Sequence, residues 1–323
     1  MEVKRAAAME NQTRVTEFIL VGFTDNHWLQ ILLFFSFLFT YLLTVLGNLL
    51  IIVITLLDQR LQTPMYFLLR NFSLLEITLT SISVPKVLFS LASGSKTISV
   101  PGCFAQCFLY VITGTAEFFM LAAMSFDRYV AICKPLHYPS IMNNQLCTQL
   151  VLGSWVISVL YVSTPFVMFF QLPFCGPNII DHFFCDSVPV IKLACIDTQY
   201  LQLLSVILAT GSVLGTFIIT IISYINIIST VMHIPSVSGR KKAFSTCVSH
   251  LTVVFIFYGS CIFMYVTPSG SSKGNFGKTV ALLNNVVSPL LSPFIYSLRN
   301  KQVKDALRDA INQNGIFCKK PKL

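Results

Sequence analysis

Four polar side chains, Asn48, Glu76, Glu117 and Ser288, interrupt long apolar stretches of this 323-residue chain. At the rise of an α-helix, all four lie about 15–17 Å from the corresponding end of their stretches. Hard cations prefer oxygen ligands, and two carboxylates at low dielectric constant cannot both stay charged and unpaired. The four residues therefore predict one polar layer, which holds either a sodium ion or a shared proton with hydrogen bonds between helices.

A second polar group, Asp127-Arg128-Tyr129, lies near the end of the apolar stretch 104–133. An arginine at a membrane edge can simply extend its charged end toward water, so only the surrounding motifs can give this group a function. Catalysis would require a nucleophile beside a base, or a metal cluster. The histidines fall on different segments and depths, so we predict that the chain is not an enzyme. These residues are His27, His137, His182, His233 and His250.

Long apolar runs must position these polar groups. A helix needs about 20 apolar residues to cross a bilayer, and continuous rather than alternating runs favour helices over a barrel. Apolar residues make up 54% of the chain and charged residues 11%, against about 25% charged in a soluble domain. We therefore predict an all-α membrane protein with a seven-transmembrane helix bundle. The runs lie near 29–57, 65–91, 104–133, 147–170, 199–231, 243–267 and 278–298.

The distribution of positive charge sets the orientation. Lys and Arg are in excess on the inner side if the N-terminus lies outside. Residues 1–27 are then an extracellular segment, 28–300 the seven-helix domain and 301–323 a cytoplasmic tail. The net charge of +9 indicates attraction to membrane lipid at the inner leaflet and not nucleic-acid binding. Asn11-Gln12-Thr13 is a candidate glycosylation site on the outer side.

The tail begins with an amphipathic segment. Across 301–311, Val303, Ala306, Leu307 and Ala310 share one helical face, which predicts a short eighth helix on the inner leaflet. Cys318 follows and is a candidate for acylation.

Four of the ten cysteines are expected outside the membrane: Cys103, Cys175, Cys185 and Cys195. In an oxidising compartment they predict two disulfides, with three pairings open. Residues 171–198 form a long loop that would then lie over the bundle, as a structural clip or as a lid that also shapes a ligand site. His182 and Asp186 flank Cys185, but a disulfide there leaves no thiolate for a metal.

Six ordered motifs give the chain a family resemblance. They are Gly47-Asn48, Leu61-Gln62-Thr63-Pro64-Met65-Tyr66-Phe67, the stretch from Met124 to Cys133, Ser223-Tyr224, the stretch from Lys242 to His250, and the stretch from Pro289 to Tyr296. With these motifs the chain resembles a rhodopsin-like G-protein-coupled receptor, specifically an odorant receptor of the airborne-odorant type. It departs from the family pattern at Gln62, Glu76, Ser125-Phe126 and Ser292, all mild changes.

The resemblance implies disulfides Cys103–Cys185 and Cys175–Cys195. It implies coupling to the olfactory stimulatory G protein, which raises cyclic AMP, and a place in the plasma membrane of olfactory cilia. No cofactor is expected beyond the candidate sodium ion. The residues assigned to coupling and activation are Asp127, Arg128, Tyr129, Tyr224, Lys242, His250, Pro293 and Tyr296.

The outer third of the bundle is the expected ligand site, because an apolar wall with a few hydroxyls is typical of a small-molecule pocket. No carboxylate accompanies Tyr110, so neutral volatile molecules are favoured over amines. Helix counting places Tyr258 at the level of Tyr110, and contact at Tyr258 is expected to move the inner end of its helix outward. The candidate residues are Tyr110, Val111, Gly114, Thr115, Ser205, Leu208, Ala209, Ser212, Tyr258, Cys261, Ile262, Tyr265 and Asn285.

The alternative is an ion- or proton-coupled transporter that uses Glu76 and Glu117. Such a protein is expected to contain broken helices in an inverted repeat, and no such repeat is apparent in the sequence.

Overall fold

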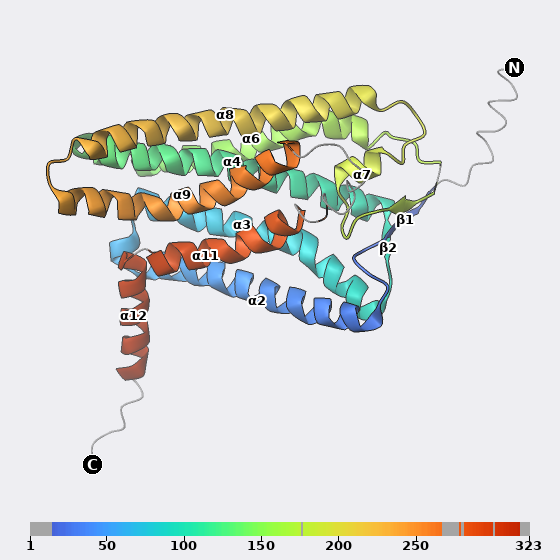
Figure 1. Cartoon of the computed structure of the whole chain (residues 1–323), viewed down its shortest axis with the longest axis horizontal. Coiled ribbons are helices and arrows are strands. Elements are labelled where there is room, and N and C mark those ends of the chain that lie inside the picture. Colours follow the sequence, from blue (N-terminus) through green and yellow to red (C-terminus); the bar gives the residue numbers. More distant parts are fainter. Residues whose placement is uncertain (1–14, 176, 267–277, 279–280, 300, 317–323) are drawn as a thin grey trace, which may run out of the picture.

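The structure is a computed structural model, which describes residues 15–175, 177–266, 278, 281–299 and 301–316. Within these residues, seven helical segments run side by side as a bundle (Figure 1). Five are long and apolar enough to span a membrane: α2 (His27–Leu57), α3 (Pro64–Ser93), α4 (Val100–Cys133), α6 (Asn144–Phe169) and α8 (Gln199–Met232). The bundle is completed by α9 (Val237–Val266) and by η3 (Leu283–Val287), a π-helical segment that continues into α11 (Ser288–Arg299). The predicted seven-helix architecture is confirmed.

Local capping explains where several helices begin. Asn26 caps α2 by accepting from the amides of Trp28 and Leu29, and Asn143 caps α6 by accepting from Leu146. The third helix starts at Val100 rather than at the predicted residue 104, because the Ser99 side chain accepts a hydrogen bond from the amide of Gly102. Such caps satisfy amides that have no partner within the helix.

The contact between α2 and α11 depends on a glycine and a proline. A Cβ at Gly47 would lie 3.0 Å from the ring of Pro293, so a larger residue would push the helices apart. Pro293 lacks an amide hydrogen and leaves the carbonyl of Pro289 without its helical partner. The Asn48 side chain donates to that carbonyl at 3.3 Å. Gly47 thus permits the close approach of the proline-containing seventh helix, and Asn48 supplies the hydrogen bond that the Pro289 carbonyl lacks.

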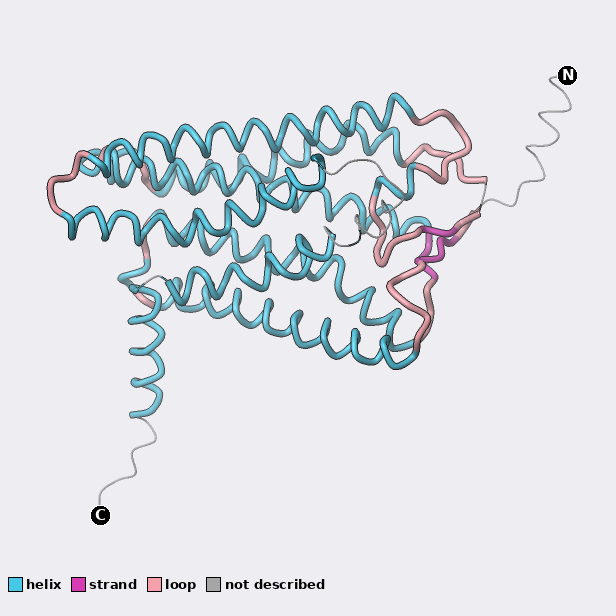
Figure 2. Tube along the Cα trace, viewed as in Figure 1, coloured by secondary structure: helices cyan, strands magenta, loops and turns pink. Residues whose placement is uncertain are grey.

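A small sheet lies at the outer end of the bundle and was not predicted. Strand β1 (Glu17–Leu20) lies between β2 (Thr97–Ser99), to which it is antiparallel, and β3 (Ile179–Ile180), to which it is parallel (Figure 2). Phe18 and Leu20 are buried, whereas Ile19 is exposed. The exposed Ile19 hides the alternation of polar and apolar residues that would identify β1 as a strand.

The long loop after α6 covers this end of the bundle as predicted. It contains β3 and a short helix, α7 (Ser187–Ile191). Disulfides join Cys103 to Cys185 and Cys175 to Cys195, with Cα–Cα distances of 5.3 and 5.7 Å. The implied pairing is therefore confirmed.

The inner end carries short helical turns and the eighth helix. These turns are η1 (Gln59–Leu61), η2 (Pro135–His137) and α5 (Tyr138–Ile141), and the eighth helix, α12 (Lys301–Ile316), is longer than predicted. Val303 and Ala306 are buried on its apolar face. Asn11 and Cys318 lie outside the described residues.

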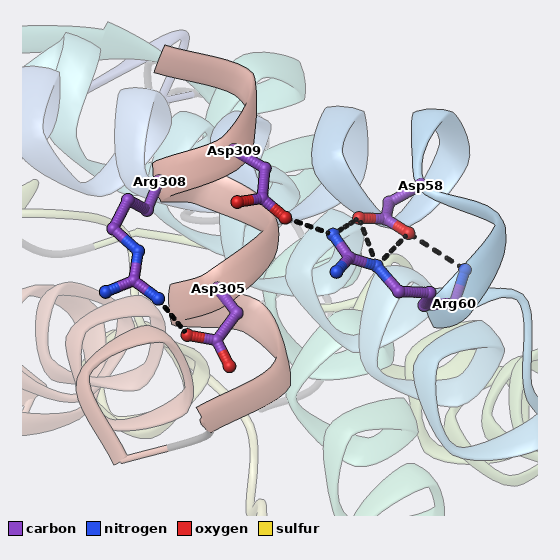
Figure 3. A network of polar contacts seen from close by, with 5 residues as sticks. All are labelled: Asp58, Arg60, Asp305, Arg308 and Asp309. Atoms are coloured by element: carbon purple, nitrogen blue, oxygen red, sulfur yellow. Dashed lines mark hydrogen bonds and ion pairs between the residues drawn. The ribbon is translucent and has the colours of Figure 1, made fainter. Parts of the chain in front are cut away.

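An ion-pair network docks α12 on the loop between α2 and α3. Arg60 bridges Asp58 at 2.7 Å and Asp309 at 2.9 Å, while Arg308 pairs with Asp305 (Figure 3). Nearby, the Tyr66 hydroxyl donates to the Gln302 side chain at 2.7 Å. The Arg60–Asp309 and Tyr66–Gln302 contacts join α12 to the inner ends of α2 and α3, where α12 turns away from the bundle axis (Figure 1).

Candidate ligand site and activation core

The loop after α6, here called the lid (residues 171–198), packs aromatic side chains over the outer end of the bundle. Tyr110 on α4 packs edge-on against Phe184, with ring centroids 5.0 Å apart, and Phe184 lies against Phe183. Gln106, one turn above Tyr110, donates to the carbonyl of Ile82 and accepts from the amide of Cys185 at 3.0 Å. This buried amide therefore joins α3, α4 and the lid.

A second aromatic layer lies deeper. Tyr258 on α9 is buried between Phe118 on α4 and Phe217 on α8, at centroid distances of 5.4 and 5.0 Å. Phe118 follows Tyr110 by about two helical turns, or roughly 12 Å. The expectation that Tyr110 and Tyr258 share one level is therefore wrong. The helix count started from Arg240, which lies further toward the inner side than Arg128.

Gly114 separates the two aromatic layers. It lies one turn from Tyr110 and one turn from Phe118, on the same face of α4. Among the described residues, no heavy atom lies within 4 Å of the position that a Gly114 Cβ would occupy. Space is therefore left between the lid layer and the Tyr258 layer, on the face of α4 that carries both aromatic contacts.

Polar groups of the predicted site differ in how they are satisfied. The hydroxyls of Thr115 and Ser212 donate to Val111 and Ala209 carbonyls of their own helices. Among the described residues, the fully buried Asn285 amide on η3 has no hydrogen-bond partner at either its oxygen or its nitrogen. Asn285 is thus the polar side chain of the set with the most unused hydrogen-bonding capacity.

The remaining predicted ligand residues differ in exposure. Val111, Ser205 and Leu208 are half-buried, and Ala209 is exposed. By helical spacing, Ala209 shares the face of α8 that carries the buried residues Ser212 and Thr216. The side chains of Cys261, Ile262 and Tyr265 lie outside the described residues, although their backbone belongs to α9.

Aromatic contacts continue from Tyr258 toward the inner side. Phe118 contacts Phe257, Phe257 contacts Phe72, and Phe72 contacts Tyr296, with centroid distances of 6.2, 6.0 and 6.5 Å. This chain of edge-on contacts passes through α4, α9, α3 and α11. It joins the deeper aromatic layer to a tyrosine that the family resemblance assigns to activation.

The predicted polar layer is assembled in the core. Asn48, Glu76, Glu117 and Ser288 are each at most 1% exposed, and the two carboxyl groups interact electrostatically. Ser292 was not predicted as part of this layer, but its hydroxyl donates to Glu76 at 2.8 Å. In this layer, four oxygens have no hydrogen-bond partner among the described residues: Asn48 Oδ1, Glu76 Oε2, Glu117 Oε1 and Ser288 Oγ.

At the inner end, Arg128 is held by its neighbour Asp127. Both side chains are buried, the Arg128 Nε donates to Asp127 at 2.9 Å, and the Tyr138 hydroxyl donates to the other carboxylate oxygen at 2.8 Å. Burial, together with the nearby Asp127 charge, raises the pKa of Tyr138 above its usual value, so the hydroxyl stays protonated as a donor.

The other predicted coupling residues surround this group. Tyr224 on α8 and His250 on α9 share a hydrogen bond of 2.6 Å. Tyr129 is half-buried and lies against Phe126 and the Lys134 ammonium. The Lys242 side chain lies outside the described residues.

Comparison with known proteins decides the family. A family profile for olfactory receptors matches residues 37–314. The chain belongs to the olfactory receptor family. It is 55% identical to olfactory receptor 6E1 of Mus musculus over 96% of this chain and 99% of that protein. It is 51% identical to olfactory receptor 6C74 of Homo sapiens over 97% of this chain and 100% of that protein.

A solved structure supports the fold independently. The structure of squid rhodopsin superimposes with a TM-score of 0.70, covering 94% of this chain and 85% of that chain at 16% sequence identity. The protein is thus a multi-pass membrane receptor that responds to odorants and acts through G proteins, and it is not an enzyme. Nothing in the comparisons favours the transporter alternative.

Proposed function

We propose that this olfactory receptor binds small neutral volatile molecules between the lid layer and the Tyr258 layer. The observation that carries this proposal is the space beside Gly114, which lies between Tyr110 and Phe118 on α4. A mostly apolar wall with few polar groups is the usual environment for small organic ligands. Asn285 can donate to or accept from an alcohol, aldehyde, ketone or ester in this space.

Activation is a change in the balance between two arrangements of the bundle. A ligand shifts that balance only if it binds one arrangement better than the other. We propose that an odorant above Tyr258 stabilises an arrangement in which the inner end of α9 has moved outward. No heavy atom of the described part of the chain lies near the Cβ position of Gly259. Because glycine weakens a helix locally, α9 can bend beside Tyr258.

The inner surface is the proposed docking site of the olfactory stimulatory G protein. A hollow of about 420 Å³ lies there, lined by residues that include Cys133, Lys134, Pro135, Leu136, His137 and Ile141. Leu136 is 91% exposed beside it, which suits burial against a partner. In this proposal the receptor works in the plasma membrane of olfactory cilia, α12 rests on inner-leaflet lipid, and Asn11 is glycosylated.

Ligand class and G protein can be tested together. Cells without endogenous stimulatory Gα would express the receptor with either the olfactory stimulatory Gα or an inhibitory Gα. They would then receive matched eight-carbon alcohols, aldehydes, ketones, amines and carboxylic acids. We expect cyclic AMP to rise only with the stimulatory subunit and mainly with neutral compounds. A response restricted to amines or acids, at normal surface expression, would contradict the proposed ligand class.

We further propose that the polar layer binds sodium in the inactive arrangement. The unpartnered oxygens of Asn48, Glu76, Glu117 and Ser288 fit a hard cation, which would neutralise the two carboxylates. We expect the melting temperature of the purified receptor to be higher in sodium chloride than in choline chloride, and Glu117→Gln to remove this difference. Equal sodium dependence in both proteins would argue for a shared proton instead.

A further inference from the structure

Lys278 joins three separate parts of the outer surface. Its ammonium group donates to Asp181 of the lid at 2.6 Å and to the carbonyl of Gly22 in the N-terminal segment at 3.2 Å. Lys278 itself precedes η3 on the way into the seventh helix. The Lys278 side chain is only 14% exposed, whereas Asp181 is 66% exposed.

The N-terminal segment reaches Lys278 because it is strapped to the lid. After β1, the amides of Val21 and Gly22 donate to the carbonyls of Ile180 and His182. Gly22 has a φ of 76°, a conformation that favours glycine and turns the chain toward α2. The N-terminal segment and the loop after α6 therefore form one layer at the outer end of the bundle (Figure 2).

The layer formed by the N-terminal segment and the lid makes different contacts toward α4 and toward the seventh helix. On the α4 side it is held by the Cys103–Cys185 disulfide, by the Gln106 hydrogen bond to Cys185 and by pairing of β1 with β2, directly before α4. Toward the seventh helix, the polar contacts of the described residues are those of Lys278. Apolar packing also joins the layer to the seventh helix, because Phe183 and Phe184 share a cluster with Val286. A partly exposed ion pair contributes little stability, and no disulfide of the described residues crosses to this side, so we expect this side to open first.

We propose that the Lys278–Asp181 pair is a releasable catch, which controls access of odorants to the space beside Gly114. The disulfide side acts as the hinge, and the seventh-helix side swings away. The inference rests on the proposed ligand space but not on the identity of any odorant. A catch lowers the rate of passage without contacting the ligand, so removing it speeds passage in both directions.

A cysteine placed in the ligand space can measure opening directly. The probe is methyl methanethiosulfonate, a small neutral reagent. The cysteine thiolate attacks the sulfur that carries the reagent's S-methyl group. A methyl disulfide forms on the cysteine, the bond to the sulfonyl sulfur breaks, and methanesulfinate leaves. The receptor carrying Gly114→Cys would be purified in lipid nanodiscs, and mass spectrometry would follow the labelled peptide over time. The same receptor with Gly114 intact gives the background from native cysteines.

We expect Lys278→Gln and Asp181→Asn, each added to Gly114→Cys, to raise the labelling rate about two- to fivefold, as suits a partly exposed ion pair. Lys278→Arg, which keeps the cation, should leave the rate near its starting value. The matched control is Asp25→Asn, because Asp25, just before α2, forms its ion pair with Lys96 in the segment between α3 and β2 and not with the loop after α6. Equal rates in all variants, or a thiol that never reacts, would overturn the catch. Because no odorant is used, this failure is distinguishable from failure of the proposed ligand class.

Discussion

Replacing Gly114 by leucine is expected to abolish odorant responses, or to raise the half-maximal concentration by about 100-fold or more. The added side chain would fill the space that the structure leaves between the Tyr110 and Tyr258 layers. Overpacking a binding space costs about 1–3 kcal/mol, and about 1.4 kcal/mol is already a tenfold loss of affinity. Leucine is a better helix former than glycine, so α4 itself should not be weakened. Concentration–response curves for cyclic AMP would measure the shift.

The matched control is Gly215→Leu. Gly215 also has no heavy atom of a described residue within 4 Å of its Cβ position, but it is exposed on α8. The same chemical change should therefore leave odorant potency unchanged there. Gly114→Ala, which adds a single carbon, should have an intermediate effect or none. Normal potency of Gly114→Leu for every active odorant, at equal surface labelling, would place the ligand elsewhere.

Replacing Asp127 by asparagine is expected to raise basal cyclic AMP about fivefold. The carboxylate holds the buried Arg128 guanidinium and accepts from Tyr138, and removing one partner of a buried ion pair is strongly destabilising. The loss falls on the arrangement that contains the pair. Even about 1 kcal/mol lost from that arrangement alone changes the ratio of the two arrangements about fivefold. Basal cyclic AMP, normalised to surface receptor, is the readout.

A graded control is Tyr138→Phe, which removes one neutral donor and leaves the ion pair in place. A single hydrogen bond contributes about 0.5–1.5 kcal/mol, so basal signalling should rise less than in Asp127→Asn. If both variants remain as silent as the wild type while odorant responses persist, the Asp127–Arg128 pair does not restrain the receptor.

Sequence alone predicted the helices and the polar layer because both depend on local counting. A carboxylate within 20 apolar residues has a depth fixed by the helix rise, and the structure brings Glu76 and Glu117 together as expected. Ser292 was missed as a partner because its contact with Glu76 depends on the rotation of α11, which a residue count does not supply.

The ligand site was only partly predictable. Tyr258 lies deeper than predicted because α9 begins at Val237, and Cys247 and His250, two to three turns after Arg240, are the residues near Arg128. The sequence does not show which residue of a long helix lies at the level of Arg128. Strand β1 forms only through backbone pairing with segments far away in the sequence, so its residues carry little local signal.

The central claim is that a ligand above Tyr258 drives activation at Arg128 through the aromatic contacts of the core. The most direct measurement is odorant-stimulated nucleotide exchange on purified stimulatory G protein, with the receptor in lipid nanodiscs. Wild type, Tyr258→Ala and Arg128→Ala would be compared at equal receptor concentration. We predict stimulated exchange by the wild type, a severe loss with Tyr258→Ala and none with Arg128→Ala. Full stimulation of exchange by Tyr258→Ala at unchanged odorant potency would contradict the account.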